Sequence, residues 1–354
     1  MTKKLLTIIL LGVCVFFTRQ GSTSADEGVS FTVDPVLPDN QTDAHQSYFD
    51  LWMEPGADQK LTVLVTNTSD EEIVVLPRVT VATTNPHMEI DYTQIDPELD
   101  ESMTLPITDI ASVEEEIVLP PHEQKEVPIE LALPNQPVEG MILGGLHFEE
   151  APSSDEEEDA QGVAVTNTYA YVIGLKLQSD ERPVEAITPE LHLHSIQPKL
   201  INYRQAITAT LQNRTAVLVD ELLIEAEVYE KNGEELLAAT THEQGRMAPN
   251  SNVDFPIEWG DAAFSPGDYH LKMKASTPEE TWEWQEVFTI EEENSESLNN
   301  EAITEDEAEE DDSGFGMVAL GGGAAAAVAA IVLSFYLGRR TTRRKEGTAD
   351  ETSA

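Results

Sequence analysis

The sequence predicts an all-β protein built from β-sandwiches, because its apolar residues alternate with polar ones and its turn signals recur at short intervals. The alternation is clear in 60–67, where Leu61, Val63 and Val65 share one face, and it returns in 268–275. Such a period of two is typical of antiparallel strands with one buried face. Turn-forming residues separate these segments at 54–56, 67–70, 231–233 and 265–267. The length of 354 residues allows two or three domains.

The chain begins with the parts of a secretory signal peptide. Lys3 and Lys4 precede a continuous apolar run, and the small residues that end at Ala25 predict cleavage after that residue. Cys14 raises the alternative of a lipoprotein, but a valine precedes it where a lipidation site needs a small residue. We therefore expect 1–25 to be a signal peptide that is removed from an exported chain.

The middle of the chain holds an acidic run at 153–159, which we interpret as an exposed loop. The apolar segments 140–149 and 163–177 flank this run, and we expect them to pair as a hairpin that closes the first sandwich. That pairing would put the junction between domains near 178–186. Further along, the β-branched residues at the ends of 219–229 favour a strand over a helix.

The C-terminal part predicts a membrane anchor. Residues 291–314 are rich in acidic side chains and lack aromatic ones, which predicts a disordered, extended stalk. The uncharged apolar stretch 315–337 is long enough to span a bilayer as a helix, and basic residues cluster in the tail at 338–354. The positive-inside rule keeps that tail in the cytoplasm. We therefore expect a single-pass, type I membrane protein with the rest of the chain outside.

Charge and composition exclude several kinds of function. The chain has 20 Lys and Arg against 67 Asp and Glu, a net charge of −47, and such a surface repels nucleic acid. Its single cysteine excludes a disulfide framework and a cysteine-based zinc site. The motifs of serine hydrolases, zinc proteases and nucleotide-binding loops are absent, so we expect neither an enzyme nor a cofactor. Carboxylate pairs suited to glycoside hydrolysis are too numerous to be informative.

Metal binding stays open as an alternative at two kinds of place. His192 and His194 would point to the same face of a strand, although two histidines need further ligands to hold a metal ion. The acidic runs could attract calcium, but neither has the ligand spacing of a calcium loop. Solvated surface side chains are the simpler interpretation of both features, and we expect no metal site.

Two further residue types admit more than one interpretation. Aromatic side chains can stack on sugar rings, although inward-facing aromatics in a sandwich are more simply explained as core. The candidates are Tyr48, Phe49, Trp52, Tyr92, Trp259, Trp282 and Trp284. Asn-x-Ser/Thr triplets begin at Asn40, Asn67 and Asn213, and would be glycosylation acceptors in a eukaryote or turn residues in a bacterium.

A series of short motifs follows one another through almost the whole of 31–290. They lie at 31–41, 47–51, 55–56, 65–67, 82–85, 137–148, 167–173, 211–213, 247–251, 266–269 and 284–290. In this order they resemble the WxL-interacting proteins of low-GC Gram-positive bacteria, and the signal, acidic stalk, anchor and basic tail are similar to that family's layout. The sequence departs from the family at Pro86-His87, where we expect a glycine-containing turn; the departure affects a loop rather than the fold.

The resemblance implies two tandem immunoglobulin-like β-sandwiches. The first, at 31–150, would bind peptidoglycan, and the second, at 162–290, would bind a WxL-domain surface protein. The chain would then be a non-catalytic scaffold anchored in the cell membrane, with its ectodomain in the cell wall. An adhesin that binds host extracellular proteins is the alternative function. A wall hydrolase would need a catalytic constellation that the sequence does not show.

The candidate peptidoglycan-binding residues are chosen for their chemistry. Loop amides can hydrogen-bond N-acetyl groups, a tyrosine can stack on a sugar, and a glycine pair within a strand allows close backbone approach. The residues are Asn40, Gln41, Tyr48, Asn67, Asn85, Gly144 and Gly145. Each amide is equally well explained as a turn-former.

Overall fold

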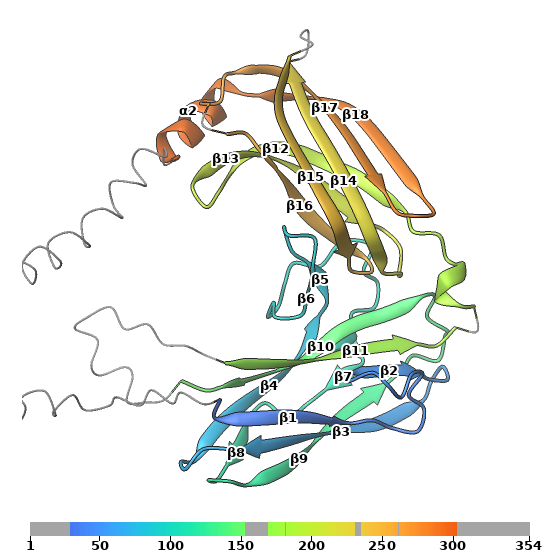
Figure 1. Ribbon diagram of the computed structural model, residues 1–354. Coiled ribbons are helices and arrows are strands. Elements are labelled where there is room, and N and C mark those ends of the chain that lie inside the picture. The colour runs from blue at the N-terminus through green and yellow to red at the C-terminus, as the bar shows by residue number, and fades with distance from the viewer. Residues whose placement is uncertain (1–28, 153–168, 181, 231–234, 261, 303–354) are drawn as a thin grey trace, which may run out of the picture. The chain divides into compact units, whose positions relative to one another are not determined.

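A computed structural model describes residues 29–152, 169–180, 182–230, 235–260 and 262–302 of the chain (Figure 1). Within these residues the structure is built almost entirely from β-strands, which confirms the all-β class. The expected signal peptide, the acidic run at 153–159, the apolar stretch at 315–337 and the basic tail lie outside the described residues. Among the residues that are described, no helix is long and apolar enough to cross a membrane.

The first pair of sheets has four and five strands. The four-stranded sheet has the order β1 (Phe31–Val36), β3 (Asp58–Asn67), β9 (Gln124–Ala132) and β7 (Ala111–Ser112). The five-stranded sheet has the order β2 (Phe49–Trp52), β11 (Ala170–Gln178), β10 (Met141–Glu150), β4 (Ile73–Val81) and β8 (Ile117–Leu119). A short ribbon of β5 (Thr83–Thr84) and β6 (Ile90–Asp91) and the 3-10 helix η1 (Ile107–Asp109) complete this part.

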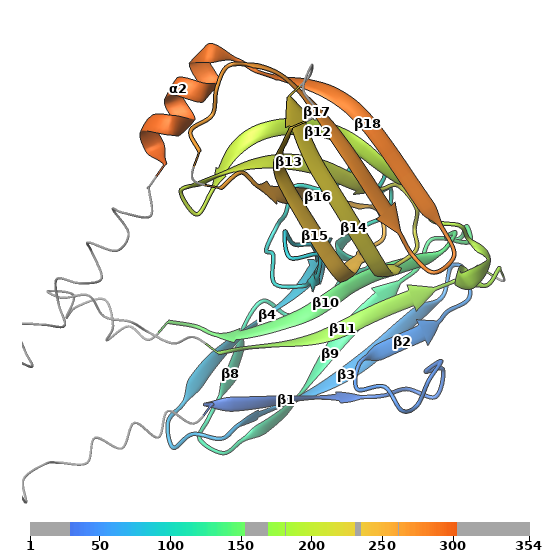
Figure 2. The same ribbon diagram turned by 45° about the horizontal axis from the view of Figure 1, so that its top comes forward.

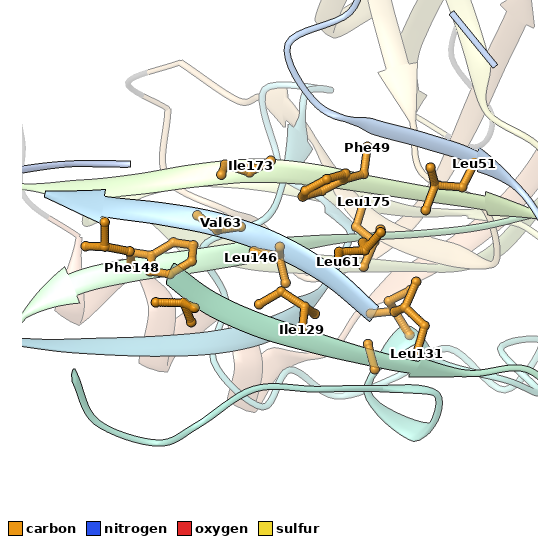
Figure 3. Close-up of a cluster of buried hydrophobic side chains, with 14 of the residues drawn as sticks. Phe49, Leu51, Leu61, Val63, Ile129, Leu131, Leu146, Phe148, Ile173 and Leu175 are labelled. Atoms are coloured by element: carbon orange, nitrogen blue, oxygen red, sulfur yellow. The ribbon is translucent and has the colours of Figure 1, made fainter. Parts of the chain in front are cut away.

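A single hydrophobic core holds these two sheets together (Figure 3). Leu61, Val63 and Val65 of β3 are buried in it, which confirms the alternation expected for 60–67. From the five-stranded sheet, Phe49 and Phe148 enter the same core and are fully buried. The two sheets therefore pack face to face as a sandwich. Full burial of each such side chain stabilises the fold by about 1.5–3 kcal/mol.

The hairpin expected on either side of the acidic run is present. Strand β10 pairs antiparallel with β11, from Met141 opposite Gln178 to Glu149 opposite Ala170. Strand β11 also pairs with β2, in parallel. The segment at 170–178 therefore completes the sheet of the first sandwich.

The second pair of sheets has three and four strands. The three-stranded sheet has the order β12 (Leu191–Ile201), β13 (Arg204–Asn213) and β16 (Ser251–Glu258). The four-stranded sheet has the order β15 (Leu236–Met247), β14 (Val219–Glu230), β17 (Gly267–Ser276) and β18 (Thr281–Ile290). The 3-10 helix η2 (Val184–Ala186) precedes these strands.

Two sequence predictions for this region are confirmed. Residues 219–229 lie in β14, as the β-branched residues at their ends predict. Tyr269, Leu271 and Met273 are buried on one face of β17, as the alternation in 268–275 predicts. The chain divides into two compact units, and the boundary between them cuts through several strands of the second pair of sheets. Residues 211–222 and 244–253 belong to the same unit as the residues up to 192.

The expected extended stalk begins instead as a helix, which corrects that prediction for its first part. Helix α2 spans Glu292–Glu301, with Glu292 and Glu293 in the first turn, where acidic side chains stabilise the positive end of the helix dipole. The side chain of Asn299 accepts a hydrogen bond from the backbone of Phe264 (2.8 Å) and donates one back to it (2.9 Å). Gln205 donates a third bond to Asn299 (2.7 Å). These tertiary hydrogen bonds stabilise a helix whose acidic and polar residues would not bury a core.

Candidate functional site

The outward face of the five-stranded sheet carries a concentrated group of aromatic, charged and glycine residues. Because side chains alternate along a strand, the residues next to the core positions of β2, β4, β10 and β11 point away from the core. We call the resulting surface the glycine–tyrosine face. It comprises Tyr48, Asp50, Trp52, Arg78, Thr80, Tyr92, Gly145, His147, Gly174 and Lys176.

Two glycines form the floor of this face, and a tyrosine lies on each of them. Gly145 of β10 is directly opposite Gly174 of β11. A Cβ atom added at Gly174 would lie 3.5 Å from the Cβ of Tyr48, an ordinary contact, and one added at Gly145 would lie 3.0 Å from the Cβ of Tyr92. The missing side chain at Gly145 therefore lets Tyr92 approach the backbone of the sheet, whereas the site at Gly174 has room for a methyl group beneath Tyr48.

Hydrogen bonds hold both tyrosine backbones in place. The hydroxyl of Thr80 donates to the carbonyl oxygen of Tyr92 at 2.6 Å. Gln41 donates from Nε2 to the carbonyl oxygen of Tyr48 at 2.8 Å and accepts a bond from the backbone of Asp50 at 3.2 Å. Burial raises the pKa of the Tyr92 hydroxyl, Arg246 lowers it, and the neighbouring Tyr48 raises it. Tyr92 is therefore a neutral hydrogen-bonding group at physiological pH.

The polar groups of the face retain unused hydrogen-bonding capacity. Asp50 is 6% exposed; its Oδ2 accepts a bond from Lys176 at 3.2 Å, while its Oδ1 has no partner among the described residues. His147 is 4% exposed, and its Nδ1 likewise has no partner in the described part of the chain. Buried polar atoms are normally paired with protein or with water, so these two covered atoms are places for ordered water.

A free cation lies beside this group. Arg78 on β4 is opposite His147 in the register of the sheet. It is exposed, and the described residues offer it no hydrogen-bond or ion-pair partner. In a chain with a net charge of −47, an unpaired guanidinium is unusual. It can form a two-pronged hydrogen bond with a carboxylate.

The chemistry of the glycine–tyrosine face suits a ligand with both apolar and anionic parts. Tyr48, Tyr92 and the 43% exposed Trp52 offer ring surfaces that can contact the C–H faces of sugars. The exposed Arg78 offers a positive charge. No reactive pair of nucleophile and base is needed for such binding.

Of the residues predicted to bind peptidoglycan, Tyr48 and Gly145 lie on this face and Gln41 supports it. Asn40 lies nearby, and its side chain donates to the carbonyl oxygen of Trp52 at 3.2 Å. Gly144 instead faces the core, where an added Cβ would lie 2.4 Å from a methyl group of Ile107. No ligand is bound, so each contact with peptidoglycan stays a prediction.

The remaining two predicted residues organise turns away from the face. Asn67 is buried and donates to the carbonyl oxygens of Leu119 and Pro120, both at 3.0 Å. Asn85 accepts bonds from the backbone of His87 (2.9 Å) and Glu89 (3.1 Å), in the turn where the sequence departs from the family pattern. Their binding role also stays a prediction.

The other aromatic candidates divide between core and surface. Phe49 and Trp259 are buried, and Trp259 packs against Phe264 and Tyr269. Trp282 and Trp284 are half-buried on β18. His192 and His194 are exposed on β12, and the described residues contain no cluster of three side chains that could hold a metal ion.

Sequence reasoning missed six members of the face: Asp50, Arg78, Thr80, His147, Gly174 and Lys176. The alternation of core residues in each strand predicts that these side chains point outward. The expected hairpin predicts that β10 lies beside β11, but alternation does not predict that β2 and β4 flank these two strands, so the proximity of the whole group becomes visible only in the structure.

Comparison with known proteins identifies both parts of the chain. Residues 31–150 match the family model described as "WxL Interacting Protein, peptidoglycan binding domain". Residues 160–300 match the model described as "WxL Interacting Protein, host binding domain". The second match includes β11, whose hydrogen bonds lie in the sheet of the first sandwich. The search of curated proteins found no match.

Several solved structures are similar to this chain, at low sequence identity. The class 5 fimbriae chaperone CfaA has 13% identity and a TM-score of 0.26, over 73% of this chain and 98% of its own. The CupB2 chaperone of Pseudomonas aeruginosa has 14% identity and a TM-score of 0.26, over 68% and 97%. The DraB chaperone of E. coli has 13% identity and a TM-score of 0.28, over 74% and 98%.

Proposed function

The chain belongs to the WxL Interacting Protein family, and we propose that it is a non-catalytic cell-surface scaffold that holds a WxL-type protein at the peptidoglycan. Residues 31–150 would bind peptidoglycan, and residues 162–290 would bind the WxL-type surface protein. Each module would be an immunoglobulin-like sandwich. A signal peptide cleaved after Ala25 and a helix at 315–337 would leave both modules outside the membrane, within the cell wall.

The observation that supports peptidoglycan binding best is the glycine–tyrosine face on the first sandwich. Peptidoglycan combines N-acetylated sugars with short peptides that carry carboxylates. Tyr48 and Tyr92 offer ring surfaces for the sugars, and Arg78 offers a partner for a peptide carboxylate.

The experiment is co-sedimentation of the full-length chain with purified peptidoglycan sacculi at physiological salt. We expect the wild-type chain to sediment, and Arg78→Ala and Tyr48→Ala each to lower the apparent affinity by about tenfold, or about 1.4 kcal/mol. Lys60→Ala is the matched control for the cation, because Lys60 is also exposed but lies on the four-stranded sheet. It should bind as the wild type does.

The outcomes distinguish two claims: that the chain binds peptidoglycan, and that it does so through the glycine–tyrosine face. A wild-type chain that stays in solution would overturn peptidoglycan binding altogether. If both variants sediment as the wild type does, the first module binds peptidoglycan through a surface other than the glycine–tyrosine face. Circular dichroism of each variant excludes unfolding as the cause of a loss.

The description of the second family model as a host binding domain favours a second candidate function, adhesion to extracellular proteins of a host. The immobilised full-length chain can be offered a purified WxL-type protein and, separately, purified host matrix proteins. We expect retention of the WxL-type protein. Retention of matrix proteins without any bacterial partner would support the adhesin, and retention of neither would overturn both functions for this module.

A further inference from the structure

The second pair of sheets ends in four edge strands, and three of them carry features that discourage another strand from pairing. Edge strands expose unpaired backbone N–H and C=O groups, which natural proteins protect with proline, lysine or irregular backbone. Strand β12 contains Pro198 and Lys199, and β16 contains Pro256. Strand β15 is interrupted by Gln244, whose φ of 58° is left-handed.

Strand β18 is the exception. It pairs with β17 along its whole length, from Thr281 opposite Ser276 to Ile290 opposite Gly267, and none of the described strands lies on its other side. Figure 2 shows it as the outermost strand of its sheet. Its ten residues contain no proline, glycine, lysine or arginine, and every described φ within it is negative. It is therefore a long and regular edge, and its only charged side chains are glutamates.

The side chains of this edge combine apolar surface with negative charge. Val287 is 53% exposed, and Trp282 and Trp284 are half-buried. Glu283 and Glu286 are exposed between them. A strand that lies beside β18 would bring its own side chains next to these, so apolar residues and cations are the complementary choice.

We propose that β18 receives an extended segment of another protein as a fifth strand of its sheet. The segment lies antiparallel to β18, with apolar residues opposite Trp282, Trp284 and Val287 and with Lys or Arg opposite Glu283 and Glu286. The main-chain ladder supplies affinity and the side chains supply selectivity. The inference rests on the proposed function in one respect, namely that the second module binds a protein.

The test uses the full-length chain and a synthetic probe, a peptide of about nine residues, close to the length of the strand, whose central six residues are Val-Lys-Thr-Val-Lys-Val. Paired antiparallel with 282–287, this order puts valines opposite Trp282, Trp284 and Val287 and lysines opposite Glu283 and Glu286. A second peptide has the same sequence with alternate amides N-methylated. It carries the same charge but lacks the donors for a ladder. We expect the first peptide to slow hydrogen exchange of amides in 281–290, and the methylated one to bind about tenfold more weakly.

Paired variants test the location. Glu283→Lys/Glu286→Lys should weaken the first peptide by about tenfold. Glu235→Lys/Glu243→Lys makes the same change of charge at β15, the opposite edge of the sheet, and should change binding by no more than about twofold. Equal binding of both peptides, or equal loss in both variants, would reveal attraction to an acidic surface only and would overturn the proposal.

A retention assay separates this proposal from the proposed function. If the wild-type chain retains a WxL-type protein and Glu283→Lys/Glu286→Lys retains it equally, the module binds a protein elsewhere and the β18 proposal falls. If the peptide binds as expected and no WxL-type protein is retained, the β18 edge stands and the partner named in the proposed function is wrong.

Discussion

Gly145 and Gly174 lie opposite each other on neighbouring strands, and each has a tyrosine over it. Neither glycine has a left-handed backbone, so neither is needed for a turn. At Gly145 the missing Cβ leaves room for Tyr92, whereas at Gly174 a Cβ would lie at an ordinary contact distance from Tyr48. The pair thus forms the floor of a face that is aromatic and yet close to the backbone.

The spacing above the two glycines predicts different effects of adding one methyl group. At Gly145 it would lie within 3.1 Å of the side chains of Tyr92, Thr80 and Val172, whereas at Gly174 it would meet Tyr48 at an ordinary distance. We expect Gly145→Ala to destabilise the fold by about 1–3 kcal/mol, as overpacking does, and Gly174→Ala to change stability by less than about 0.5 kcal/mol. Denaturant unfolding of both variants measures the difference, and equal effects would contradict the described packing.

Asn67 and Asn213 have the same role in the two sandwiches. Each ends a strand, donates from Nδ2 to backbone carbonyls and accepts bonds from the residue two positions later, Ser69 or Thr215. Both side chains are buried, so the folded protein does not present these triplets as glycosylation acceptors.

We expect Asn67→Ala to cost about 2–4 kcal/mol, because it leaves several buried carbonyl groups without a donor. Asn40→Ala is the control: Asn40 also begins an Asn-x-Thr triplet, but it is exposed and should cost less than about 1 kcal/mol. Thermal unfolding of both variants tests the prediction. A cost at Asn40 that equals the cost at Asn67 would show that burial does not decide the effect.

The sequence predicts strands well where alternation is strict and predicts contacts between strands poorly. Segments 60–67 and 268–275 alternate clearly, and both are strands with the expected residues buried. The contact between Gly145 and Gly174 depends on the register of β10 and β11, and a shift of one residue would turn every side chain to the other face. The alternation within each strand restricts the register to steps of two residues, and it does not select Gly174 among the outward residues of β11 as the partner of Gly145.

Residue composition alone gave the wrong expectation at two places in the chain. The Gly144-Gly145 pair suggested one site of close approach, but neighbouring residues of a strand face opposite ways, so Gly144 accommodates Ile107 in the core. The acidic residues at 292–301 predicted an extended chain. The helix forms because Asn299 docks on Phe264, a contact between residues far apart in sequence.

The carboxylate of Asp254 predicts a dependence of stability on pH. Burial raises its pKa, but hydrogen bonds from Lys199 and Thr210 (2.6 Å for the latter) and the charge of Lys199 outweigh burial, so the pKa lies below its usual value of 3.8. Because the pKa is lower in the folded state than in the unfolded one, these contacts stabilise the protein at pH values above 3.8. The stabilisation is lost as the pH falls through the lower, folded-state pKa.

Asp254→Asn should therefore lower the melting temperature at pH 7, and the difference from the wild type should shrink as the pH falls below about 4. Asp58→Asn removes an exposed carboxylate that has no hydrogen bond to its side chain among the described residues, and it should leave the melting temperature unchanged at pH 7. Scans of both variants across this range measure the effect. A difference for Asp254→Asn that stays constant with pH would contradict the assignment.

The hydrogen bonds of α2 predict that Asn299 holds the helix in place and that its exposed neighbour Asn300 does not. Asn299→Ala removes both bonds to Phe264 and the bond from Gln205, and should destabilise the docked helix by about 1–3 kcal/mol. Asn300→Ala makes the same substitution at the next, exposed position and should have little effect. Hydrogen exchange of amides in 292–301 reports the result directly, because a ten-residue helix without tertiary contacts is marginal in water. Faster exchange in Asn299→Ala alone is expected; equally slow exchange in both variants would show that the helix holds its place without this contact.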